Sequence, residues 1–171
     1  MRYIYVFLIL IGFISARNGF SQDNHSFDYF LEQAKTYNES RDFDTAYHYI
    51  QKAIAIDSNS ADAFFLSAII YENLHDLEKA NKSYSKAIKI NPKPVYYNNR
   101  GINKAIKGKY STAIVDYQEA LKLDNKYKQA WFNKAVAHYK MGEIQQACKD
   151  AGKAYDLGLE VAKQFIDRNC N

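Results

Sequence analysis

A helix-like pattern recurs along this chain at intervals of 33 or 34 residues. Residues 110–124 read "YSTAIVDYQEALKLD", and related strings occupy residues 43–57, 77–91 and 144–156. Two alanine columns keep the same register through all four copies: Ala46, Ala80, Ala113 and Ala147, then Ala53, Ala87, Ala120 and Ala154. Because independent columns share one spacing, the chain is predicted to consist of four copies of one structural unit.

Each unit is predicted to contain two helices joined by a short turn. Upstream of each string lies a second repeating pattern, with an aromatic column and a small-residue column: Phe30, Phe64, Tyr97 and Trp131, then Ala34, Ala68, Gly101 and Ala135. These residues fall at helical spacing, and they indicate an apolar stripe on each first helix. Gly108 and Gly142 occupy the turn in units three and four, where a left-handed backbone suits glycine. Arg41 and His75 take that place in units one and two, so those turns should be less favourable.

A single helix pair cannot cover its own apolar face, but stacking one pair on the next does. The 15 tyrosines and 10 phenylalanines fall largely in the repeating columns, so most are expected to fill the core. A length of 171 residues is compatible with one domain. The expected fold is therefore an all-α solenoid.

The repeat resembles the tetratricopeptide repeat family over roughly residues 27–158. Unit three carries the pattern as "YYNNRGINKAIKGKYSTAIVDYQEALKLD", and unit two keeps the closing proline as Pro92. The resemblance implies a right-handed α-solenoid in which the first helix of each pair lines a concave groove. Lys104, His138 and Ala151 replace tyrosines of the pattern, and these departures are expected to weaken packing between particular helices.

The chain is divided into seven predicted segments. The four repeats are assigned to residues 27–60, 61–93, 94–127 and 128–158. Residues 159–171 are expected to form a capping helix, because an open stack needs a polar terminal element. Residues 1–21 are interpreted as a signal peptide and residues 22–26 as a short N-terminal segment.

The signal-peptide interpretation rests on a short apolar run after Arg2. The run from Tyr3 to Ile14 spans 12 residues, against roughly 20 for a bilayer-spanning helix. Small residues at Gly19 and Ser21 mark a cleavage site before Gln22, as in secretory signals. We therefore expect a periplasmic or secreted protein; the alternative is an uncleaved segment that anchors the chain in the inner membrane.

Charge and motifs give little support for nucleic-acid binding or catalysis. Loss of residues 1–21 would lower the net charge from +4 to +2, and the lysines and arginines form no concentrated patch. The four histidines are scattered, and neither H-E-x-x-H, a glycine-rich phosphate loop nor G-x-S-x-G occurs. We expect no enzyme activity, no catalytic residues, no metal and no cofactor.

The two cysteines are placed for a disulfide. Cys148 and Cys170 lie at equal sequence distances from Leu159, where the chain is expected to turn between two antiparallel helices. Equal distances place the two residues side by side, and a bridge suits an exported chain. The alternative is a pair of free thiols.

The predicted groove is the candidate binding site. Under the family geometry, its stripe passes through the first helices of units two to four and includes Glu72 and Ala105. The candidate partner-binding residues are Phe65, Ile69, Asn98, Ile102, Phe132, Val136 and Tyr139. This stripe lacks the basic residues with which family members grip acidic C-terminal peptides, so a hydrophobic or helical peptide is expected. Alternatively, neighbouring helices cover some of these residues.

The functional expectation is a non-catalytic interaction module or scaffold of the cell envelope, with a protein or peptide partner and no nucleic acid. Contact with a membrane is expected only through the N-terminal segment, if it stays uncleaved. A structural subunit that self-associates, or packs into an envelope assembly without a groove ligand, is the alternative. The identity of the partner does not follow from the residues.

Overall fold

The computed structural model describes residues 26–170, which form nine α-helices and no strand. The predicted signal peptide lies outside the described residues, as does nearly all of the segment 22–26. The helices are α1 (Phe27–Glu39), α2 (Phe43–Ile56), α3 (Ala61–Asn73), α4 (Leu77–Ile90), α5 (Pro94–Ile106), α6 (Tyr110–Leu123), α7 (Lys128–Lys140), α8 (Ile144–Asp156) and α9 (Glu160–Asn169). Within this part of the chain, every helix is too short or too polar to cross a membrane.

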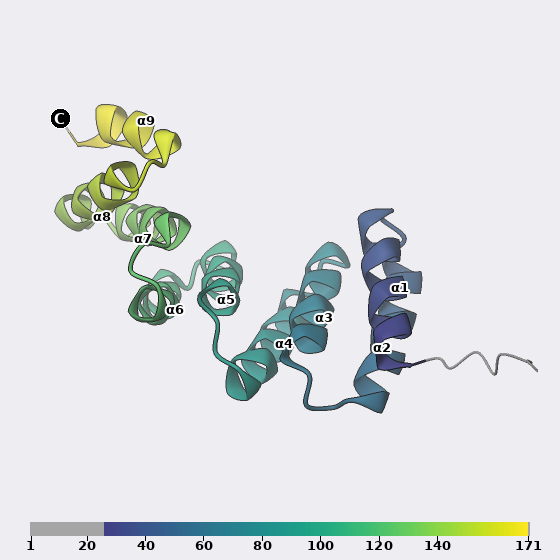
Figure 1. Ribbon diagram of the computed structural model, residues 1–171. Helices are drawn as coiled ribbons and strands as arrows, with labels where there is room; N and C mark the ends of the chain where they lie inside the picture. Colours follow the sequence, from purple (N-terminus) through teal and green to yellow (C-terminus); the bar gives the residue numbers. More distant parts are fainter. Residues whose placement is uncertain (1–25, 171) are drawn as a thin grey trace, which may run out of the picture.

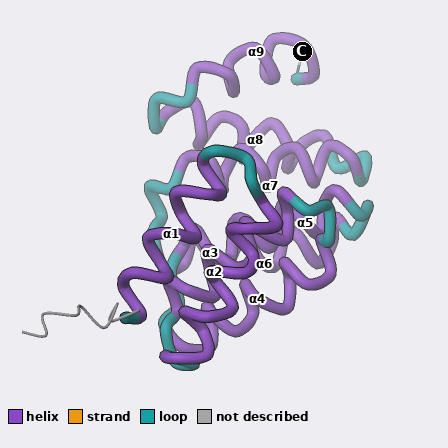
Figure 2. The backbone as a smooth tube through the Cα atoms, turned by 90° about the vertical axis from the view of Figure 1, so that its right-hand side faces the viewer, coloured by secondary structure: helices purple, strands orange, loops and turns teal. Residues whose placement is uncertain are grey.

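Consecutive helices pack as pairs, and the pairs stack into an arc. The closest packing joins α1 to α2, α3 to α4, α5 to α6 and α7 to α8, and each pair then contacts the next. Figure 1 shows α3, α5 and α7 on the inner side of the arc, with α4, α6 and α8 outside them. The view turned by 90° shows α7, α8 and α9 following one another toward the C-terminal end (Figure 2). The predicted right-handed α-solenoid with a capping helix is confirmed.

Polar residues fix where the early helices begin. The side chains of Ser26 and Ser60 accept hydrogen bonds from backbone amides in the first turns of α1 and α3. Asp42 and Asp76 do the same for α2 and α4. Such caps satisfy amides that have no partner inside the helix. Helix α5 instead begins with Pro94, whose missing N–H costs nothing at a first helical position.

The alanine columns lie at the closest contacts between helices. All eight column alanines of the second helices are fully buried, as the repeat predicts. Large side chains fill the space beside them, and Tyr84 and Tyr117 are at most 1% exposed. At Gly101 the fit is tightest, because a Cβ there would meet the Tyr117 ring at 2.6 Å. Unit three therefore needs glycine where the other units carry alanine.

The turns inside the repeats have the predicted left-handed backbone. Gly108 and Gly142 adopt φ angles of 72° and 79°. Arg41 and His75 adopt φ angles of 65° and 60°, a conformation that costs non-glycine residues about 1–2 kcal/mol. The prediction that the first two turns are less favourable than the last two is confirmed.

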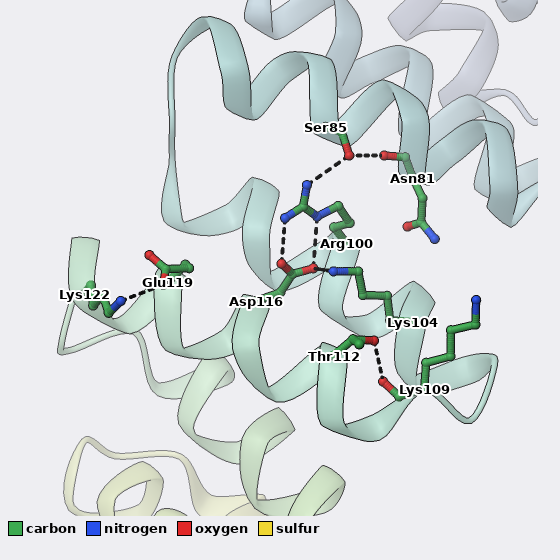
Figure 3. Close-up of polar contacts among 9 residues, drawn as sticks. All are labelled: Asn81, Ser85, Arg100, Lys104, Lys109, Thr112, Asp116, Glu119 and Lys122. Carbon is green, nitrogen blue, oxygen red and sulfur yellow. Dashed lines mark hydrogen bonds and ion pairs between the residues drawn. The ribbon is translucent and has the colours of Figure 1, made fainter.

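Lys104, one of the residues that replace the family tyrosines, takes part in a buried ionic cluster. Lys104 Nζ lies 2.7 Å from Asp116, which also accepts two hydrogen bonds from Arg100 at 2.6 and 3.0 Å (Figure 3). Asp116 is 2% exposed, so this cluster is buried between α5 and α6. The expectation that Lys104 merely weakens packing was therefore incomplete, because an ionic cluster replaces the aromatic contact.

The same positions form a similar cluster in unit four. Asp150 is 4% exposed and lies 3.0 Å from Lys134 Nζ and 3.6 Å from His138 Nε2. Burial raises the pKa of Asp150, and the neighbouring lysine opposes that shift. His138 thus replaces a tyrosine by contributing to a polar contact, as Lys104 does in unit three.

Candidate functional site

Two neighbouring cavities open on the inner face of the arc, one on each side of α5. Ile102 and Ile106 of α5 line both of them. Ile106 is 66% exposed, more than any other large apolar side chain among the described residues. A protruding isoleucine between two hollows makes this part of α5 the centre of the candidate site.

The first cavity lies between α3 and α5 and has a volume of about 490 Å³. Its lining combines apolar and polar side chains: Glu72, His75, Leu77, Asn99, Ile102, Asn103 and Ile106. Burial raises the pKa of the Glu72 carboxyl, although the Tyr84 hydroxyl and the Asn103 amide beside it partly oppose the shift. Asn99 Nδ2 in turn donates to Tyr84 Oη over 3.4 Å. This cavity therefore contains a carboxyl group that is partly shielded from solvent.

The second cavity lies between α5 and α7 and has a volume of about 270 Å³. Apolar groups of Ile102, Ala105, Ile106 and Val136 form much of its wall. Tyr117, which is buried beneath α5, contributes to the lining as well. The cavity has the size and character of a site for one apolar side chain.

The structure brings together two of the predicted partner-binding residues. Ile102 and Val136 come from different repeats and line the same cavity. Ile69 is half-buried on α3. Phe65 is also half-buried, and its ring lies 4.7 Å from that of Tyr96 on the next repeat. Phe65 thus packs between repeats, and it does not line either cavity.

Neighbouring residues cover Asn98, another of the predicted positions. It is 3% exposed and accepts a hydrogen bond of 2.9 Å from Asn133 of the next repeat. A matching bond of 2.8 Å joins Asn73 to Asn38 in the first two repeats. Asn98 is therefore covered by its neighbours, which was the alternative to an exposed position in the groove. Its side-chain amide links two repeats.

Helix α9 packs against two residues of the predicted stripe in unit four, Phe132 and Tyr139. The Phe165 ring of α9 lies edge-on to Phe132 and Tyr139, with centroids 5.9 and 5.5 Å away. Phe132 is half-buried, and Tyr139 remains 38% exposed. The open part of the inner face therefore lies on α3, α5 and the adjoining side of α7.

The two cysteines lie next to each other where α9 follows α8. Their Sγ atoms lie 2.08 Å apart, and the Cα atoms of Cys148 and Cys170 are separated by 5.7 Å. Figure 1 shows α9 following α8 at the end of the stack. The equal spacing from Leu159 thus corresponds to a real approach of the two side chains.

Sequence reasoning missed Asn103 and Ile106 as site residues, and it placed Glu72 in the stripe without proposing a role. Ile106 directly follows the expected stripe position Ala105, so its exposure depends on where α5 ends. Asn103 is next to Ile102 in sequence, but its burial depends on packing against α3 and α4. An isolated apolar residue at the last position of a first helix was the available signal for Ile106.

The arrangement is suited to non-covalent binding. In the described part of the chain, no three histidine, cysteine or acidic side chains cluster closely enough to hold a metal ion. The two cavities present apolar walls, three side-chain amides (Asn99, Asn103 and Asn133) and one carboxyl, that of Glu72. Such surfaces bind side chains of another molecule through burial and a few directed polar contacts.

Comparison with known families identifies the repeat in three places. Tetratricopeptide repeat families match residues 61–94 and 128–157, and a family described as TPR repeat matches residues 104–142. A TPR repeat-containing protein of Methanocaldococcus jannaschii is 27% identical over 130 residues. That alignment covers 76% of this chain and 23% of the relative, so the chain spans only about a quarter of the relative's length.

Solved structures share the fold. The crystal structure of MamA superposes with a TM-score of 0.76 at 21% identity, covering 82% of this chain and 83% of MamA. The first TPR of Spaghetti (RPAP3), solved bound to the HSP90 peptide SRMEEVD, gives a TM-score of 0.62 at 22% identity. It covers 67% of this chain and 93% of that structure.

Proposed function

Because the chain belongs to the tetratricopeptide repeat family, we propose that it is a non-catalytic interaction module that holds a peptide segment on the inner face of its arc. The coarse function, a protein-interaction module, agrees with the peptide complex of the RPAP3 repeat domain. The proposed ligand is a hydrophobic or helical segment, which would lie across α3, α5 and α7.

One observation carries this proposal: Ile106 is 66% exposed beside two cavities that it shares with Ile102. Exposed apolar surface next to shaped hollows is typical of ligand sites. The cavities come from successive repeats, so a segment crossing α5 could place side chains in both. The acidic peptide bound by the RPAP3 domain is a poor chemical match, because Glu72 would repel it.

A crosslinking experiment tests the site and the partner together. Ile106 is replaced by the photo-reactive amino acid benzoylphenylalanine in the native organism, and crosslinked products are identified by mass spectrometry. The matched control replaces Val115, which is 53% exposed on the outer helix α6. We expect one protein partner to crosslink at 106 and not at 115. Equal crosslinking at both positions would contradict the groove, and a second copy of this chain would favour the self-associating subunit.

We further propose that the protein acts in the cell envelope after removal of residues 1–21. The short apolar run and the approach of Cys148 to Cys170 both suit an oxidising compartment. Intact-mass measurement of the protein from a Gram-negative host should give a chain that begins at Gln22. An uncut chain that only detergent extracts would contradict export and support the membrane anchor.

A further inference from the structure

The Glu72 carboxyl is an acid without a cationic partner on the inner face. It is half-buried on α3 and lines the cavity of about 490 Å³. The ion pairs found among residues 26–170 join other acids, and none includes Glu72. A partly desolvated carboxyl without a counter-charge is costly unless something else supplies the charge.

Neutral hydrogen-bonding groups stabilise the ionised Glu72 carboxyl only in part. Tyr84, fully buried on α4, hydrogen-bonds to Glu72 and to Asn99. Asn103 faces the same carboxyl, and it also lowers the pKa of Glu72. Burial is nevertheless the largest influence, and it raises that pKa. The protein thus positions an acid here at a cost to its own stability, as binding sites commonly do.

A second observation, a buried amide donor, lies in the same cavity. Asn103 is 2% exposed, and its Nδ2 has no hydrogen-bond partner of normal geometry. Buried amide donors are rarely left in this state in folded proteins. Since Asn103 lines the cavity, an acceptor that enters there, such as a peptide carbonyl, would satisfy it.

We propose that this cavity binds a lysine or arginine side chain of a peptide, whose cationic end pairs with Glu72 while its carbonyl group accepts from Asn103. This inference rests on the proposed function, and it specifies the chemistry of the ligand. The aliphatic stem of the basic residue lies along Leu77, Ile102 and Ile106, in the manner of long charged side chains on apolar surfaces. An apolar residue of the same peptide occupies the second cavity beyond Ile106.

The test measures selectivity with a defined probe. The purified protein is incubated with pools of N-acetylated, C-amidated heptapeptides in which one position is fixed as lysine, arginine, norleucine or glutamate. We expect retention of the lysine and arginine pools to exceed that of the glutamate pool about tenfold or more. In the variant Glu72→Gln, this preference should disappear while binding of the norleucine pool persists.

The matched control is Glu78→Gln, which removes an acid with a 71% exposed side chain on α4. It should leave the preference for basic pools unchanged. One possible result is that the norleucine pool binds the wild-type protein and does not bind Ile106→Asn, while the basic pools bind no better than the glutamate pool. That result would support the groove function and refute the basic subsite. If basic selectivity persists in Glu72→Gln, the subsite is likewise refuted. Binding of no pool refutes both.

Discussion

Replacement of Asp116 by asparagine should strongly destabilise unit three. Asp116 is 2% exposed and accepts charge-assisted hydrogen bonds of 2.6 and 3.0 Å from Arg100, beside Lys104 at 2.7 Å. Asparagine keeps the shape of the side chain but removes the negative charge. Two cations are then left together between α5 and α6 without an anion.

The magnitude follows from how far those cations are buried. Removal of one partner from a buried ion pair costs about 3–5 kcal/mol. The side chains of Arg100 and Lys104 are 18% and 25% exposed, so both recover some hydration and the lower end applies. For a domain of this size, about 3 kcal/mol corresponds to a decrease in Tm of roughly 10 °C.

Thermal and urea unfolding followed by circular dichroism provide the assay. The control is Glu119→Gln on the same helix, which removes an ion pair of the same 2.6 Å length to Lys122 (Figure 3). The side chains of Glu119 and Lys122 are 38% and 69% exposed, so Glu119→Gln should lower the free energy of unfolding by only about 0–1 kcal/mol. Equal losses for the two variants would refute the argument that burial, and not ion pairing as such, sets the contribution of Asp116.

Other predictions concern packing, ionisation and the C-terminal helix. Gly101→Ala should lower the free energy of unfolding by about 1–3 kcal/mol, because the new Cβ meets the Tyr117 ring at 2.6 Å. Gly152→Ala should raise it by up to about 1 kcal/mol, because no atom lies within 4 Å of the new Cβ. Equal effects of the two substitutions in urea unfolding would contradict this reasoning. Because burial raises the pKa of Glu72 above its ordinary 4.5, Glu72→Gln should raise Tm at pH 7. That advantage should vanish below about pH 4, where glutamate is protonated in both states; an equal Tm change at both pH values would contradict it. Cys170→Ser should lower the free energy of unfolding by about 3 kcal/mol in non-reducing buffer; an unchanged value would show that no bridge forms.

The repeat columns made the fold predictable from sequence. An alanine column indicates a close contact between helices, and a glycine in a turn indicates a left-handed backbone. Both features can be predicted from the residue type at a single position. Gly108 and Gly142 are examples, because their φ angles follow from the turn alone. The lower suitability of Arg41 and His75 was predictable for the same reason.

The ionic clusters were harder to predict because they join residues on different helices. Lys104 reads as a simple departure from the pattern until Asp116 is placed opposite it. Unit four repeats the combination with His138 and Asp150, so two columns change together. Comparison of pairs of columns, in addition to single columns, would have revealed this relation.

The candidate groove was only partly predictable. Ile102 and Val136 line one cavity as the helical stripe suggested, but Asn98 is buried. The coverage of Tyr139 depends on how α9 packs beside α7, and no column of the repeat encodes that packing. Exposure at a solenoid end is set by the terminal helix, which follows the repeat only loosely.

The most direct test of peptide binding on the inner face is a methyl NMR titration. The protein carries labelled isoleucine δ1 methyl groups, and the added ligand is a peptide spanning the partner segment that crosslinks at position 106. Saturable shifts are predicted for Ile102 and Ile106, with none for Ile56 and Ile144, which are 54% and 40% exposed and line neither cavity. Saturable shifts confined to Ile56 or Ile144 would contradict the proposed site.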